Sequence, residues 1–313
     1  MTDSGFAYTI APSGHRLHGE ASLGRVRLQV ADLARSVTYY ESVVGLRIIE
    51  RDVTRAVLGA HDDPTPLVEL QHRDGATPVP QRGRLGLYHF AILLPDRAAL
   101  GRFITHLAEI GVYAGMADHL VSEAVYLTDP DGLGIEVYAD RPREEWRIAN
   151  RALEMATNTL DAADLVRASQ GVAWNGMPAG TRIGHVHLFV SDLDAAARFY
   201  HDGLGLDKVV LDFPGALFMS AGGYHHHLGT NTWAASAPRT KPEDARLLEW
   251  SVVLPRQTDV DATARALEDV GATVTRTDGD VLAADPWGTT VRVTAASSPP
   301  APADRDTALG RGA

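Results

Sequence analysis

An internal repeat restricts the possible folds of this chain more than any other feature. When the 313 residues are aligned with themselves, Asp32 falls on Asp192 and Tyr40 falls on Tyr200, at one common shift of 160 positions. Further along, Pro95 falls on Pro255 in the same way. Such self-similarity indicates tandem copies of one structural unit. The aligned pairs of segments are 23–46 with 183–206, 88–112 with 249–272, and 126–138 with 281–293.

Each copy predicts the same order of secondary structure. A short alternating apolar run, such as the one that ends at Val190, indicates a strand, and an aspartate after it can cap a helix. Apolar residues then follow at helical spacing, and a glycine such as Gly45 ends the helix. Two or three more strands complete a βαβββ unit, which occurs four times. Because one unit cannot cover its own sheet, we expect an α+β protein whose four units form two barrel-like domains.

The remaining segments divide the chain around these units. We expect a leader, a helical linker whose sequence runs from REEW to LVRA, and a disordered tail rich in proline and alanine. The predicted parts are the leader 1–21, a first domain 22–140, the linker 141–180, a second domain 181–295, and the tail 296–313.

Composition excludes several classes of protein. Without cysteine the chain has no disulfide, thiolate nucleophile, zinc–cysteine site or iron–sulfur cluster. A net charge of -11 disfavours binding to phosphate backbones, so we expect no nucleic-acid partner. No apolar run approaches the ~18 residues of a membrane span, and the first residues do not resemble a secretory signal. These features predict a cytoplasmic protein with no membrane partner, and exposed sheet edges could support a homo-oligomer.

The four-unit pattern resembles the vicinal oxygen chelate superfamily, which includes glyoxalase I, extradiol dioxygenases and bleomycin-resistance proteins. Between about residues 22 and 295 the chain is also similar to bacterial catechol 2,3-dioxygenases. The resemblance implies an extradiol dioxygenase of aromatic catabolism that uses O2 to cleave a catechol beside its vicinal hydroxyl groups. The segments that carry it are GLYHFAILLPDRAALG, ADHLVSEAVYLTDPDGLGIEVYADRPREEW, IGHVHLFVSDL and SAGGYHHHLGTNTW.

The resemblance also implies a metal site on three strands. In this superfamily the ligands lie on the first strand of a unit, seven residues before the aspartate that starts the helix, and on the last strand. The matching residues here are His89, His185 and Glu136. Two imidazoles and one carboxylate form a facial triad that suits Fe2+, and Mn2+ shares the same ligands. Each residue alone could be structural, but their joint occurrence at ligand positions favours a metal.

Four more residues are candidates for the same site. The resemblance places His226 where extradiol enzymes keep an acid–base histidine. If residues 225–227 form the last strand of the third unit, alternation lets either His226 alone or its two neighbours face the site. Tyr126 and His119 match a tyrosine and a histidine that precede the ligand glutamate. His187 shares a face with His185 and is expected to support the ligands without binding the metal.

Residue types also predict which units share the metal. Units two and three carry the histidines and Glu136, whereas units one and four carry Arg25, Arg292 and either Glu249 or Trp250 at the matching positions. Arginine does not ligate metals but pairs with carboxylates. We therefore expect unit two to pack with unit three around one metal, and unit one with unit four around an Arg/Glu-bridged counterpart. Two other functions remain open: a glyoxalase-like isomerase or lyase that uses another metal, and a metal-free binding protein.

Overall fold

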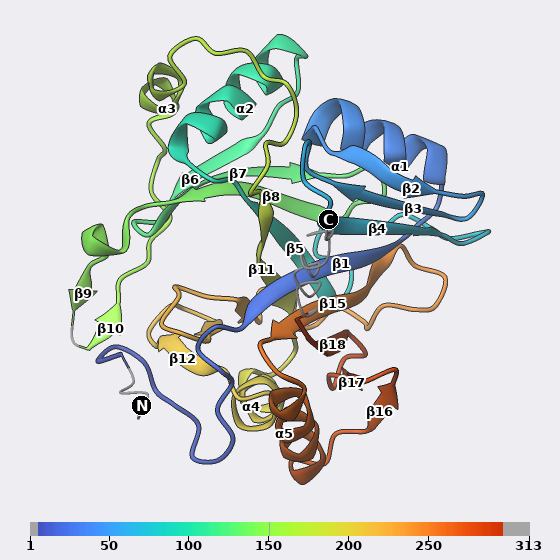
Figure 1. Ribbon diagram of the computed structural model, residues 1–313, viewed down its shortest axis with the longest axis vertical. Helices are drawn as coiled ribbons and strands as arrows, with labels where there is room; N and C mark the ends of the chain where they lie inside the picture. The colour runs from blue at the N-terminus through green and yellow to red at the C-terminus, as the bar shows by residue number, and fades with distance from the viewer. Residues whose placement is uncertain (1–5, 150, 297–313) are drawn as a thin grey trace, which may run out of the picture.

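The computed structural model describes residues 6–149 and 151–296, and in these residues each of the four copies forms a βαβββ unit (Figure 1). The first unit contains β1 (Ser22–Val30), α1 (Leu33–Tyr39), the π-helical turn η1 (Tyr40–Val44), β2 (Arg47–Arg51), β3 (Arg55–Gly59) and β4 (Pro66–His72). The second contains β5 (Gly86–Leu93), α2 (Arg97–Glu109), β6 (Gly115–Asp118), β7 (Ser122–Thr128) and β8 (Gly134–Asp140).

The second half repeats this order. Its third unit contains β11 (Arg182–Phe189), α4 (Leu193–Ala197), the π-helical turn η3 (Arg198–Gly203), β12 (Asp207–Val210), β13 (Ala216–Ser220) and β14 (Leu228–Asn231). The fourth contains β15 (Arg246–Leu254), α5 (Gln257–Asp269), β16 (Val274–Thr277), β17 (Asp280–Ala284) and β18 (Thr290–Ala295). The α+β class and the repeated unit predicted from the sequence are therefore confirmed.

The helices begin as the repeat predicts. The carboxylates of Asp32, Asp96 and Asp192 each accept a hydrogen bond from a backbone N–H in the first turn of the following helix. Such caps stabilise a helix start because they satisfy donors that have no partner within the helix. In the fourth unit this position is Arg256, whose side chain does not cap the helix.

The units pair in the order that residue types predicted. One eight-stranded sheet, the central-unit sheet, has the order β12-β13-β14-β11-β5-β8-β7-β6 and joins units two and three. The other, the outer-unit sheet, has the order β16-β17-β18-β15-β1-β4-β3-β2 and joins units one and four. In each sheet the first strands of the two units pair antiparallel at the centre. These pairs are β5 with β11 in the central-unit sheet and β1 with β15 in the outer-unit sheet. Each sequence half, 22–140 or 181–295, thus contributes one unit to each sheet.

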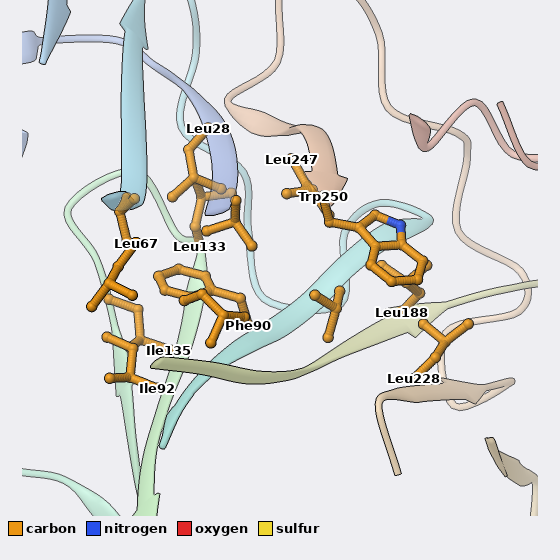
Figure 2. Packing of buried hydrophobic residues seen from close by; sticks show 14 of the residues in the cluster. Leu28, Leu67, Phe90, Ile92, Leu133, Ile135, Leu188, Leu228, Leu247 and Trp250 are labelled. Atoms are coloured by element: carbon orange, nitrogen blue, oxygen red, sulfur yellow. The ribbon is translucent and has the colours of Figure 1, made fainter. Parts of the chain in front are cut away.

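One apolar core joins the two sheets. Figure 2 shows Phe90 and Ile92 of β5 packed beside Leu28 of β1, with Trp250 of β15 nearby. All four side chains are fully buried. Alternation along β5 therefore assigns Phe90 and Ile92 to the core and His89 and Ala91 to the opposite face of the central-unit sheet. This second face is where the candidate ligands lie.

The prediction that the linker is helical is wrong for most of the linker's length. Its described residues, 141–149 and 151–180, contain only a 3-10 turn, η2 (Arg143–Glu145), two short strands, β9 (Ile148–Ala149) and β10 (Ala152–Leu153), and the seven-residue α3 (Ala162–Ala168). Paired backbone hydrogen bonds hold Asn158 in extended form against Asp118 of β6. Tertiary pairing therefore overrides the helical pattern. The helix that does form, α3, lies beside α2 (Figure 1).

The described part of the leader packs on the third unit. Ile10 pairs with Lys208 of β12, and the Arg16 guanidinium donates two hydrogen bonds to the Asp207 carboxylate. The predicted disordered tail lies outside the described residues from position 297 onward. None of the described helices is both long enough and apolar enough to cross a membrane.

Candidate metal centre and active site

Three adjacent strands bring the predicted metal ligands together. His89 lies on β5, Glu136 on β8 and His185 on β11, and β5 is hydrogen-bonded to both of the other strands. Nε2 of His89 and Nε2 of His185 each lie 3.0 Å from the same oxygen, Oε2 of Glu136. One potential ligand atom from each residue lies within 4.8 Å of the others. All three side chains are buried, with no more than 4% of any residue exposed.

These residues fit a divalent metal ion. Nδ1 of His89 and Nδ1 of His185 are buried without a hydrogen-bond partner, and Nε2 of His89 makes no hydrogen bond although it lies close to Glu136. A buried polar atom without a partner costs about 1 to 3 kcal/mol, so the cluster is poorly satisfied by protein atoms alone. A cation bound by Nε2 of both imidazoles and by the carboxylate would give Nε2 of His89 the partner that it lacks. Such a triad leaves coordination positions open, as in non-haem iron oxygenases.

The charge states also suit ligation. Burial lowers the pKa of His185 to about 4, so its imidazole is neutral at neutral pH. Burial alone would raise the pKa of Glu136, but the neighbouring His185 and His89 outweigh it and hold that pKa well below its usual value. The cluster therefore offers a neutral His185 imidazole and an anionic carboxylate, the forms that bind metals.

The ligands open into a cavity of about 390 Å³. This volume accommodates a single-ring compound with small substituents. Most of the remaining wall is apolar or aromatic, and its polar groups are concentrated around the ligands. The other lining residues include Tyr88, Met116, His119, Tyr126, Met155, His187, Phe213, Phe218, His226 and Trp233.

Tyr126 and His119 form a hydrogen-bonded pair in this cavity. Tyr126 on β7 lies directly opposite Glu136 on β8, and its hydroxyl lies 2.5 Å from Nε2 of His119. Nδ1 of His119 lies 2.6 Å from the Ala156 carbonyl, which can only accept, so Nδ1 carries the proton and Nε2 accepts from Tyr126. Burial raises the pKa of Tyr126 well above its usual value and keeps the phenol protonated. A tight turn at Leu120, whose φ is 70°, lets His119 reach Tyr126 although only seven positions separate the two residues.

His226 faces the cavity, but it does not lie on a strand as the sequence predicted. Residues 225–227 form a loop, because Gly222 and Gly223 turn the chain at positive φ and β14 begins only at Leu228. The ring of His226 packs on His185 with 4.0 Å between centroids. Burial lowers the pKa of His226 well below its usual value, so the ring is neutral at neutral pH and can accept a proton.

His187 lies two residues after His185 on β11 and contacts the ligand His89. Its ring lies 5.1 Å from that of His89, between centroids, and its Nε2 accepts a hydrogen bond of 3.0 Å from the Asn231 amide. The structure thus brings all seven predicted site residues to one cavity. It adds Phe218 and Trp233 to the cavity wall, and Asn231 as a hydrogen-bond partner of His187. Sequence reasoning missed these residues because strand alternation within a single unit does not show what faces it across the sheet.

The fourth ligand position of the repeat is occupied by glycine. Glu136 pairs with Ala91, two residues after His89, and the equivalent pairing in unit three joins His187 to Gly229. The counterpart of Glu136 is therefore Gly229. The missing side chain leaves room for the His187 ring, because a Cβ at Gly229 would lie 2.9 Å from Cγ of His187.

We accordingly expect Gly229→Ala to displace His187 and to destabilise the fold by about 1 to 3 kcal/mol, the usual cost of overpacking. Urea unfolding followed by tryptophan fluorescence measures this change. As a matched control, Gly271→Ala should have a smaller effect, since a Cβ there meets no neighbouring atom, although its positive φ adds strain. Equal midpoints for the two variants would contradict the packing argument.

The outer-unit sheet carries charged residues at the same four positions. The structure places Glu249 at the position of His89, whereas Trp250 is buried in the core. Arg292 donates hydrogen bonds of 2.7 and 3.0 Å to the Glu249 carboxylate. Arg25 pairs at 3.1 Å with Glu69, the counterpart of Glu136. The predicted Arg/Glu-bridged counterpart is confirmed, and Glu69 is a member that the sequence alignment missed.

Comparisons with known proteins agree with this architecture. Residues 22–137 and 182–293 match the Glyoxalase/Bleomycin resistance protein/Dioxygenase superfamily. A catechol-2,3-dioxygenase of Bacillus subtilis (strain 168) is 41% identical over 274 residues, covering 86% of this chain and 95% of that protein.

Solved structures share the fold at low identity. A candidate dioxygenase from Bacillus subtilis subsp. subtilis strain 168 superposes with a TM-score of 0.62 at 14% identity, covering 90% of this chain and 86% of that chain. Glyoxalase I from Zea mays superposes with a TM-score of 0.52 at 18% identity, covering 88% and 92%. At these identities the likeness shows the fold alone.

Proposed function

This chain belongs to the Glyoxalase/Bleomycin resistance protein/Dioxygenase superfamily, and from that premise we propose that it is an extradiol dioxygenase that cleaves a catechol. The observation that carries the proposal is the cluster of His89, Glu136 and His185 at the wall of a cavity that His226 also lines. The 41% identical relative named catechol-2,3-dioxygenase supports the same reaction class.

The metal would be held by the two imidazoles and the carboxylate. Bound Fe2+, or Mn2+, would supply Lewis acidity that favours the ionised catechol and a redox centre that lets O2 react with it. We propose Fe2+ because the fourth position, Gly229, adds no second carboxylate. Sites of the glyoxalase type commonly use two histidines and two glutamates, and this cavity offers one glutamate.

The chain's own residues would handle protons and orient the substrate. His226, neutral in its buried setting, can accept a proton from a catechol hydroxyl. The Tyr126 hydroxyl donates its own proton to His119 and can accept a hydrogen bond from the substrate. Aromatic walls such as Phe218 and Trp233 exclude water from the ring. Overall, one catechol and one O2 combine without loss of atoms: the carbon–carbon bond beside one hydroxyl breaks, and a hydroxymuconic semialdehyde results.

One experiment separates this function from its alternatives. The protein is purified without oxygen, its metal content is measured, and O2 uptake is followed after catechol is added. We expect iron and one O2 consumed for each catechol. Another bound metal without O2 uptake would favour a glyoxalase-like isomerase or lyase, and the absence of metal would favour a binding protein.

Tyr126 provides a finer test of the reaction. We expect Tyr126→Phe to keep its metal and lower kcat by about tenfold, because the substrate loses one positioned hydrogen-bond partner within the site. Steady-state O2 uptake and metal analysis measure this change. Tyr39→Phe serves as the control, since that hydroxyl belongs to unit one, donates to the Thr128 carbonyl and does not line the cavity of the metal ligands. Unchanged turnover in Tyr126→Phe would exclude Tyr126 from the reaction.

We also propose a cytoplasmic location, in line with the absence of cysteine from the sequence. A catecholic compound and O2 would then be the partners of the site. A homo-oligomer remains a proposal that light scattering can test.

A further inference from the structure

A chain of hydrogen bonds runs from His226 to Asp140 at the end of β8. Nδ1 of His226 lies 2.7 Å from Nδ1 of His225, and Nε2 of His225 lies 2.9 Å from Oδ1 of Asp140. Asp140 is the last residue of β8, the strand that carries Glu136. The His225 side chain is fully buried, whereas 24% of the Asp140 side chain is exposed. The chain therefore links the cavity to a carboxylate at the surface.

The carboxylate of Asp140 determines which nitrogen donates in each of these hydrogen bonds. An ionised carboxylate only accepts hydrogen bonds, so Nε2 of His225 must carry a proton and donate it to Asp140. A neutral His225 then has a lone pair on Nδ1. Because two lone pairs would repel at 2.7 Å, Nδ1 of His226 must be the donor. The remaining nitrogen of His226, Nε2, is left as the acceptor.

We propose that Asp140 and His225 are positioning residues that hold His226 in the Nδ1–H tautomer, with the Nε2 lone pair free for a substrate proton. The inference rests on the proposed function of His226 and extends it to two residues that do not touch the substrate. Among the described residues, no hydrogen bond engages Nε2 of His226, although this histidine lines the cavity. In the opposite tautomer Nε2 would carry a proton and could not act as a base.

Packing holds the intermediate ring of this chain in place. The His225 ring lies 4.1 Å from Tyr224 and 5.5 Å from Trp146, measured between centroids. Tyr224 also donates a hydrogen bond of 3.1 Å to the same Asp140 oxygen that accepts from His225. Aromatic contacts restrict the ring, and the carboxylate selects its tautomer, so the arrangement fixes both orientation and protonation.

The variant Asp140→Asn tests the inference with little change in shape. An amide can donate to Nε2 of His225, which moves the His225 proton to Nδ1 and reverses the chain. We expect kcat for catechol to fall about 10- to 50-fold, while KM and metal content change less than about threefold, because a base in the wrong tautomer slows only the proton transfer. Tyr224→Phe is the matched control. It removes a different hydrogen bond to the same oxygen, so we expect turnover within about threefold of wild type.

Nitrogen NMR of isotope-labelled histidine measures the tautomer directly. The full chain is loaded with diamagnetic Zn2+, and the His226 signals are assigned by their loss in His226→Gln. We expect the Nδ1–H pattern in the wild type and in Tyr224→Phe, and an Nε2–H or mixed pattern in Asp140→Asn. An Nε2–H wild type would overturn the inference, and so would an unchanged tautomer and kcat in Asp140→Asn.

The two readouts separate this inference from the proposed function. If wild-type protein consumes no O2 with catechol, the proposed function fails, but the NMR spectrum still reports whether Asp140 sets the tautomer of His226. If the wild type turns over catechol while Asp140→Asn behaves like Tyr224→Phe, the function stands and the positioning role is wrong. If Asp140→Asn does not fold, the wild-type spectrum alone decides.

Discussion

Glu136→Gln is expected to lose its metal and at least about 10³-fold of its turnover while the fold persists. A neutral amide cannot balance a divalent charge, and it supplies a much weaker ligand than a carboxylate. Glutamine has nearly the same shape, so the variant creates no cavity in the sheet. Metal analysis after anaerobic purification and O2 uptake with catechol measure the loss, and circular dichroism checks the fold.

The outer-unit sheet supplies a control at the equivalent position. Glu69 is buried, as Glu136 is, but it pairs with the guanidinium groups of Arg25, Arg27 and Arg55. We expect Glu69→Gln to keep its metal and turnover and to lose about 1 to 3 kcal/mol of stability, since partly exposed arginines lose a shared partner. If Glu136→Gln kept full metal, or Glu69→Gln lost it, the ligand assignment would be wrong.

His226→Ala is expected to retain its metal and to lower kcat by about 10²-fold or more. The ring packs on His185 but is not needed as a ligand, because the triad is complete without it. Removal of a general base costs about 10² to 10⁴ in rate, and burial keeps the His226 pKa low enough for the ring to be unprotonated near neutral pH. Steady-state kinetics at neutral pH, together with metal analysis, measure the effect.

The same histidine run contains its own control. His227 follows directly, but its Nδ1 accepts from the Ala221 backbone N–H and its side chain lines a different cavity. We expect His227→Ala to turn over catechol within about threefold of wild type. Loss of metal in His226→Ala would instead identify it as a fourth ligand and would favour the glyoxalase-like alternative.

The features that the sequence predicts best are those repeated in several units. The βαβββ order occurs four times, and residue types at equivalent positions were enough to pair unit two with unit three. Unit one carries arginine at the first-strand position where units two and three carry histidine. This difference assigns the units to different sheets, because a permanent cation cannot be a metal ligand. The triad of His89, Glu136 and His185 was implied by the resemblance to the vicinal oxygen chelate superfamily, and the structure brings the three residues together.

The features that sequence reasoning missed depend on contacts between segments that are distant in the chain. Asn158 is held extended by β6, so a helical pattern gave the wrong structure for the linker. Gly229 and Glu69 occupy positions equivalent to Glu136, yet only the strand register shows this, because loops of unequal length hide the alignment. His226 reaches the site from a loop made by two glycines at positive φ, which strand alternation could not predict.

The pairing of units has a consequence for the order in which this protein can fold during synthesis. Units two and three are neighbours in the chain, so the sheet with the metal triad can close once β14 has left the ribosome. Unit one is made first but pairs last, because β1 must wait for β15. Until then the nascent chain carries an unpaired apolar strand edge, the kind of surface that recruits chaperones or other copies of the chain.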